Sequence, residues 1–145
     1  MYKKILVALE NGHADKALLP HISQLARQLG SELLLVHVAD GWGARNYDRL
    51  NLAESAEMKG DRIYLEETAA QLRQSGLRVT AHLALGDPAP EILKAAAREH
   101  CDLIAMTSHG HRFLGDLVFG STIHEVRHSS TIPVLLVHAS SATAI

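Results

Sequence analysis

Short runs of apolar residues alternate along the chain with longer segments of helical periodicity. Four of these runs are continuously hydrophobic, which is typical of strands that are buried on both faces in a parallel sheet. They are KKILVALE (3–10), ELLLVHV (32–38), CDLIAMT (101–107) and IPVLLVHA (132–139). A fifth run, LRVTAHLAL (77–85), alternates apolar with polar residues, so we expect an edge strand with one half-exposed face.

The segment between the first two runs predicts an amphipathic helix. Its apolar positions are spaced by four, three and four residues, which places them on one helical face. They are Leu18, Ile22, Leu25 and Leu29. Gly30 follows directly and is predicted to end the helix in the left-handed conformation. Pro20 is expected in the first turn, where its missing N–H removes no hydrogen bond.

Three further helices are expected between the later strands. The first runs from about Leu52 to Gln74 and follows a loop at 39–51 that has neither helical nor strand periodicity. The second opens with Asp87 as its N-cap and Pro88 at its first helical position. The third covers the segment STIHEVRHSS (121–130).

Strands and helices therefore alternate throughout the 145 residues, which predicts parallel strands joined by right-handed crossovers. We expect a single domain over residues 1–145, folded as a Rossmann-like, three-layer α/β sandwich around a five-stranded parallel sheet. A chain of this length can bury roughly two thirds of its unfolded surface in one core. In such folds a ligand binds beyond the carboxyl ends of the strands, where the winding direction reverses.

The last strand is a candidate site of self-association. Its centre, VLLV (134–137), is apolar on both faces, and no further apolar run follows it. A strand added last to a sheet tends to leave an edge of unpaired backbone groups. We expect a second copy to cover this edge and to form a homodimer through Val134–Val137. Burial beneath the chain's own C-terminal residues is the alternative.

Composition and charge exclude several classes of partner. The 14 Lys and Arg residues are balanced by 16 Asp and Glu residues, so the chain lacks the basic surplus that nucleic-acid binding needs. The apolar run after the first two lysines is too short for a signal peptide or a membrane span, so we expect a cytoplasmic protein with no membrane contact. Cys101 is the single cysteine, and we expect it to be a packed thiol.

Few segments of the sequence match a catalytic or metal-binding motif. The sequence has no P-loop and no GxSxG elbow, and its one HExxH string is HEVRH (124–128). His124 and His128 have the i, i+4 spacing of zinc ligands, but without an obvious third ligand we expect them to face solvent. His37 lies inside a buried run and is expected to be a hydrogen-bonded core group. We therefore predict no catalytic residue and no metal site.

The segment TSHGHRFLGDLVFGST (107–122) has the features of an anion-binding loop. Gly110 and Gly120 flank nine residues, and glycine lets a ligand approach the backbone closely. Gly120, Ser121 and Thr122 are predicted to start a helix, whose free N–H groups and positive dipole end favour a phosphate. The alternative is that Thr122 and Glu125 form a capping box and that the glycines only turn the chain.

The order of these segments resembles that of the universal stress protein family. The resemblance runs along the whole chain and is carried by KKILVALE, SELLLVHV, GDPAPEILKAAAREHCDLIAMTSHG, LVFGST and IPVLLVH. It implies a five-stranded parallel sheet of the adenine nucleotide alpha-hydrolase-like type. It also implies a dimer that forms through the last strand.

ATP-binding members of this family carry a glycine, two residues, a second glycine, nine residues, and then a glycine followed by serine or threonine. Gly110, the nine-residue spacer, Gly120 and Ser121 match this pattern. Thr107 occupies the position of the first glycine, and Glu10 stands where the family typically has aspartate. A β-branched side chain thus replaces a hydrogen atom where the family's ligand passes close to the backbone.

By matching position, the resemblance implies a site for ATP or another adenine nucleotide, with or without Mg²⁺. The adenine and ribose side would comprise Ala8, Leu9 and Glu10, with Val38 and Met106 in apolar contact with the base. The phosphates would face Gly110, Gly120, Ser121 and Thr122, and Thr107 completes the site.

Three functions remain open at this point. The first is a non-catalytic regulatory module of a stress response, which binds an adenine nucleotide and works as a homodimer. The second is a weak metal-assisted nucleotide hydrolase, with Glu10 and Asp40 on magnesium and His109 or His111 as acid and base. The third is a family member that binds no nucleotide, because of Thr107, and acts through protein interactions.

Overall fold

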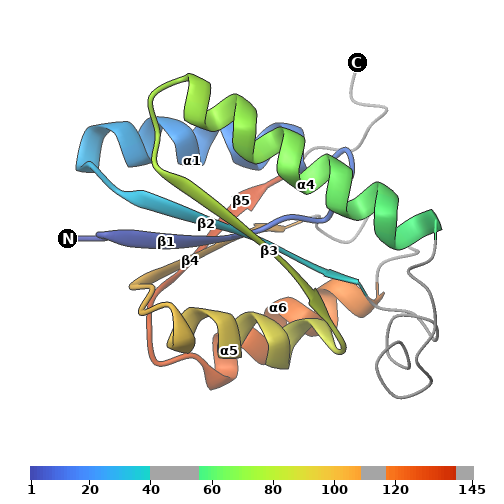
Figure 1. Ribbon diagram of the computed structural model, residues 1–145. Helices are drawn as coiled ribbons and strands as arrows, with labels where there is room; N and C mark the ends of the chain where they lie inside the picture. Colours follow the sequence, from blue (N-terminus) through green and yellow to red (C-terminus); the bar gives the residue numbers. More distant parts are fainter. Residues whose placement is uncertain (40–55, 109–116, 140–145) are drawn as a thin grey trace.

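The computed structural model describes residues 1–39, 56–108 and 117–139, and Figure 1 shows how they are arranged. Strands and helices alternate in the order β1 (Lys4–Ala8), α1 (Asp15–Leu29), β2 (Glu32–Ala39), α4 (Ala56–Gln74), β3 (Val79–Leu85), α5 (Pro88–Arg98), β4 (Leu103–Ser108), α6 (Leu117–Ser129) and β5 (Val134–His138). The alternation that the sequence predicted is therefore confirmed. The predicted loop at 39–51 and the predicted helix start at Leu52 lie almost wholly outside the described residues.

The five strands form one parallel sheet in the order β3-β2-β1-β4-β5. From β1 the chain winds outward to β2 and β3, and it then crosses back to add β4 and β5 on the other side of β1. The winding direction thus reverses between β1 and β4. Crevices form at such a reversal because the loops leaving the two neighbouring strands diverge to opposite faces of the sheet.

Helices cover both faces of the sheet, as a three-layer sandwich requires (Figure 1). On one face α1 and α4 pack against alternate strand residues, and this core includes Ile5, Val7, Leu18, Ile22, Leu33, Leu35, Leu65 and Ala105. On the other face α5 and α6 pack against the intervening residues, and this core includes Leu6, Ala8, Leu34, Val36, Ile92, Ile104, Met106 and Val126. The central strands are buried on both faces, which explains why their sequences do not alternate.

The two strands predicted to lie at edges do so. β3 alternates as expected: Val79 is buried, Thr80 is exposed, and Ala81 and Leu83 pack against the α1–α4 core. β5 lies at the opposite edge, and Leu136 at its centre is 36% exposed. Cys101, between α5 and β4, is a buried free thiol. Burial raises the pKa of this thiol to about 11, so it stays protonated near neutral pH.

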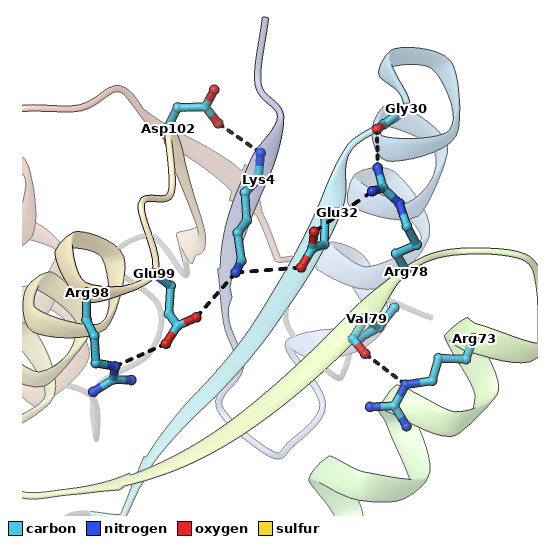
Figure 2. Close-up of polar contacts among 9 residues, drawn as sticks. All are labelled: Lys4, Gly30, Glu32, Arg73, Arg78, Val79, Arg98, Glu99 and Asp102. Carbon is cyan, nitrogen blue, oxygen red and sulfur yellow. Dashed lines mark hydrogen bonds and ion pairs between the residues drawn. The ribbon is translucent and has the colours of Figure 1, made fainter.

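Ion pairs tie the amino ends of the strands together (Figure 2). Lys4 Nζ lies 3.6 Å from Glu32 on β2 and 3.3 Å from Glu99 after α5. The carboxylate of Asp102 accepts hydrogen bonds from the backbone N–H groups of Lys3 and Lys4, at 2.9 and 3.1 Å. This end of the sheet is occupied by its own contacts, so a ligand has to be sought at the carboxyl ends.

The sequence predicted that Pro20 lies in the first turn of its helix, and this prediction is wrong. Helix α1 begins at Asp15, which makes Pro20 its sixth residue. The helix begins there because loop N–H groups hold the Asp15 carboxylate and fix the first turn. Pro20 and Lys16, four residues before it, are both exposed. Water can therefore serve the Lys16 carbonyl that the proline leaves without a donor. Gly30 ends the helix in the left-handed conformation, as predicted, with φ 70°.

Helix α6 also begins earlier than predicted, at Leu117 rather than near Gly120. Gly120, Ser121 and Thr122 are therefore the fourth to sixth residues of the helix, and neither the helix start at Gly120 nor the alternative capping box of Thr122 with Glu125 is correct. Thr122 and Val126, one helical turn apart, are 6% and 0% exposed. Packing of this face prevails over the low helix propensity of glycine, serine and threonine.

Candidate functional site

The apolar residues implied for the base-binding side lie together at the carboxyl ends of three neighbouring strands. Ala8 ends β1, Val38 lies near the end of β2, and Met106 lies near the end of β4. All three side chains belong to, or pack against, the core on the α5–α6 face. Val38 is only partly buried, so the patch reaches the surface. An apolar floor at the reversal point is suited to a flat hydrophobic ring.

Leu9 does not join this patch. Its side chain is 4% exposed and lies in the core on the opposite, α1–α4 face. Its backbone N–H donates to the carbonyl of Val36 at 2.8 Å, and its carbonyl lies 2.9 Å from His37 Nδ1. Leu9 therefore holds the loop in place, and its side chain points away from the site.

The two residues that depart from the family pattern are bonded to each other. Thr107 Oγ1, on β4, donates a hydrogen bond of 2.7 Å to Glu10 Oε2, just after β1. Thr107 is 3% exposed and Glu10 is partly exposed. This bond joins the ends of the two strands between which the winding reverses, which is where folds of this kind form a crevice.

A buried carboxylate, which sequence reasoning missed, organises the loop between β1 and α1. Asp15 is fully buried and accepts hydrogen bonds from the N–H of Glu10 at 3.0 Å, the N–H of Gly12 at 3.3 Å and the hydroxyl of Tyr64 at 2.9 Å. Burial raises the pKa of Asp15, against the effect of these donors. The loop amides form an anion-binding nest, and the chain's own carboxylate already fills it.

His37 joins the same loop to helix α4. Its Nδ1 faces the Leu9 carbonyl, and its Nε2 lies 3.4 Å from Asp61 Oδ2. The side-chain N–H of Asn11 donates to the Asp61 carbonyl oxygen at 3.1 Å, and Asn11 itself has a positive φ of 56°. The prediction that His37 is hydrogen-bonded is confirmed, but its side chain is only partly buried and lies at the margin of the core. Asp61 was not predicted because its partners are far away in the sequence.

The phosphate side of the implied site is only partly described. Ser121 is exposed and Thr122 is buried on α6, while Gly110 lies outside the described residues. Because α6 starts at Leu117, helical geometry commits the N–H groups of Gly120, Ser121 and Thr122 to intrahelical bonds. Any free N–H groups of this helix therefore precede Gly120.

Within residues 1–39, 56–108 and 117–139, no three histidine, cysteine, aspartate or glutamate side chains lie close enough to hold a metal ion. His124 and His128 stack on the exposed face of α6 with ring centroids 6.2 Å apart. Of the groups proposed for a metal-assisted hydrolase, Glu10 is described, while Asp40, His109 and His111 lie outside the described residues. In the same described part, no helix has the length and apolar character needed to cross a membrane.

Comparison with known proteins gives a family match along nearly the whole chain. Residues 1–138 match the model of the universal stress protein family. The universal stress protein MJ0577 of Methanocaldococcus jannaschii is 28% identical, over 94% of this chain and 95% of its own length. The solved structure of MJ0577 superposes with a TM-score of 0.81 and covers 98% of this chain and 99% of its own.

More distant solved structures share the fold. The universal stress protein from Archaeoglobus fulgidus in complex with dAMP has a TM-score of 0.70 at 19% identity and covers 94% of this chain and 98% of its own. A universal stress protein in complex with cAMP has a TM-score of 0.69 at 16% identity and covers 94% and 97%.

Proposed function

The chain belongs to the universal stress protein family, and from this premise we propose that it is a non-catalytic regulatory module that binds an adenine nucleotide and works as a homodimer. The observation that carries the proposal is the apolar floor of Ala8, Val38 and Met106 at the reversal of the sheet, where the Glu10 carboxylate is bonded to Thr107, the residue after Met106. A flat base and a hydrogen-bonding sugar match this combination of apolar and acceptor groups.

Charge supports one orientation for such a nucleotide. The Asp15 carboxylate fills the nest of loop amides after β1, and Glu10 lies beside it. A phosphate group placed there would meet the negative charge of a carboxylate that already holds the N–H groups of Glu10 and Gly12. The nucleoside end is therefore proposed to lie over β1 and β2, with the phosphates directed toward the segment between β4 and α6.

Two structural neighbours support the ligand class. Both proteins have this fold, and the ligands in their complexes, dAMP and cAMP, are adenine nucleotides. We propose the same class for this chain, with ATP among the candidates and Mg²⁺ as an optional companion of the phosphates. Binding would act by shifting the protein between states that differ in their affinity for a partner.

A second candidate is a family member that binds no nucleotide and acts through its surface. The hydrogen bond from Thr107 to Glu10 favours it, because this bond already spans the crevice. The two candidates predict opposite results in a binding experiment, so one titration separates them.

The test is calorimetric titration and thermal unfolding of the full chain with ATP, ADP, AMP and cAMP up to millimolar concentration. A ligand present at one hundred times its Kd should add about 2.7 kcal/mol to the free energy of unfolding. Val38→Glu should abolish binding by placing a charge in the apolar floor. Ile63→Glu is the matched control, because Ile63 is 57% exposed on α4, across the sheet from the floor. No heat and no stabilisation with any of the four would reject the nucleotide proposal.

A further inference from the structure

We infer that Thr107 is a positioning residue, which holds the Glu10 carboxylate across the crevice as a fixed acceptor for the donor groups of the bound nucleoside. The inference rests on the proposed nucleotide function and adds to it a residue that sets specificity. It starts from the bond of 2.7 Å between Thr107 Oγ1 and Glu10 Oε2, which links residues 97 positions apart in the sequence.

The two halves of this pair differ in how firmly they are held. Thr107 lies within β4 and is 3% exposed, so the strand and the surrounding core fix its side chain. Glu10 follows β1 on a loop and is partly exposed. A glutamate side chain has three rotatable bonds and loses considerable rotamer freedom when it is ordered. A buried hydroxyl that donates to its carboxylate restrains this side chain.

The chemistry of a carboxylate limits what it can recognise. An ionised carboxylate only accepts hydrogen bonds, and it repels phosphate. AMP offers three donor groups away from its phosphate: the 2′-hydroxyl, the 3′-hydroxyl and the 6-amino group. A carboxylate fixed at the carboxyl ends of β1 and β4 therefore selects nucleosides that carry the donor it faces. If the carboxylate moves freely, this discrimination weakens.

The experiment measures Kd by calorimetry for AMP, 2′-deoxy-AMP, 3′-deoxy-AMP and inosine monophosphate, which lacks the 6-amino group. For the unaltered protein we expect at least one analogue to bind about tenfold or more weakly than AMP, as the loss of a hydrogen bond to a charged group typically gives. Thr107→Val keeps the shape of the side chain but removes the donor. The ratio of the Kd of the discriminated analogue to the Kd of AMP should therefore fall toward one. Thr107→Ser keeps the hydroxyl and should retain the ratio.

Further variants keep the inference open to refutation. Thr107→Ala removes the donor without a branched side chain and replaces Thr107→Val if that protein does not fold. Glu10→Gln should also remove the discrimination, and combining it with Thr107→Val should add little, because both changes disable the same acceptor.

Two results would overturn the inference alone: a Thr107→Val protein that discriminates as well as the unaltered one, or an unaltered protein that binds AMP and all analogues equally. An unaltered protein that binds none of them would overturn the proposed function, and this inference with it.

Discussion

Asp15 is the residue whose ionisation most directly affects the loop beside the site. Its carboxylate is fully buried and holds the N–H groups of Glu10 and Gly12 and the hydroxyl of Tyr64. Burial raises the pKa of Asp15 above its ordinary value of 3.8 and also raises the pKa of Tyr64, which therefore remains a donor. The folded state binds the Asp15 proton more tightly than the unfolded state does.

This raised pKa gives a signed prediction for stability. Between pH 3.8 and the higher pKa of the folded state, the folded protein carries more protons at Asp15, so its contribution to the free energy of unfolding falls as pH rises. Asp15→Asn removes this dependence. Urea unfolding of both proteins from pH 4 to 7 should show the stability of the unaltered protein, relative to Asp15→Asn, decreasing with pH and then levelling off.

The slope is the measurement that matters, because the amide also changes the hydrogen bonds and shifts the stability by a constant amount. Glu125→Gln removes an exposed carboxyl on α6 and is the control for general charge effects. A relative stability that stays flat or increases over the window would contradict the raised pKa of Asp15.

Sequence reasoning identified single residues well where the residue's own strand determined its surroundings. His37 was predicted to be a hydrogen-bonded core group because it interrupts a buried apolar run, and it is hydrogen-bonded, although only partly buried. Asp15 and Asp61 were missed because Tyr64 and Asn11, their partners, are 49 and 50 positions away. No local pattern marks an aspartate that will be buried by a distant helix.

At the scale of the element, helix α1 tolerates a proline in its second turn. Pro20 is the sixth residue, and it lies on the exposed face. A proline inside a helix costs about 3 kcal/mol relative to alanine, from the lost N–H and the clash with the carbonyl four residues earlier. Proline also restricts the unfolded chain, and this offsets about 0.4–1 kcal/mol of that cost.

Pro20→Ala is therefore expected to stabilise the protein by about 2–2.6 kcal/mol, the difference of these two values, as measured by urea unfolding at neutral pH. His21→Ala is the matched control, because the neighbouring side chain is also exposed and its replacement changes only helix propensity. That variant should change the free energy of unfolding by less than about 0.7 kcal/mol. A Pro20→Ala protein that is no more stable than this control would show that α1 has adapted to the proline.

Element boundaries were less predictable than element types. All five strands and the left-handed Gly30 follow from apolar runs and turn chemistry. The start of α6 does not, because Gly120, Ser121 and Thr122 are typical residues of a helix beginning. In the fold, the buried faces of Thr122 and Val126 set the axis of the helix, which continues back to Leu117. Only the tertiary structure contains this information.

At the scale of the whole molecule, the sheet order accounts for the location of the candidate site. The order β3-β2-β1-β4-β5 has its reversal between β1 and β4, and the sequence predicted a parallel sheet with a ligand at its carboxyl ends. It did not predict that Thr107 and Glu10 would contact each other, because that contact depends on β1 and β4 lying side by side. The site is thus predictable as a place in the fold, while its polar contacts are not.

The same sheet order leaves β5 at an edge, and the proposed homodimer depends on it. Leu136 at its centre is 36% exposed. A lysine on an edge strand opposes pairing with another strand, so Leu136→Lys should convert the dimer to a monomer in analytical ultracentrifugation while circular dichroism stays unchanged. Ile63→Lys is the matched control, because Ile63 is an exposed apolar residue on α4, away from that edge. An unaltered protein that sediments as a monomer at micromolar concentration would contradict the proposed homodimer. A Leu136→Lys protein that remains dimeric would show that the dimer interface does not depend on β5.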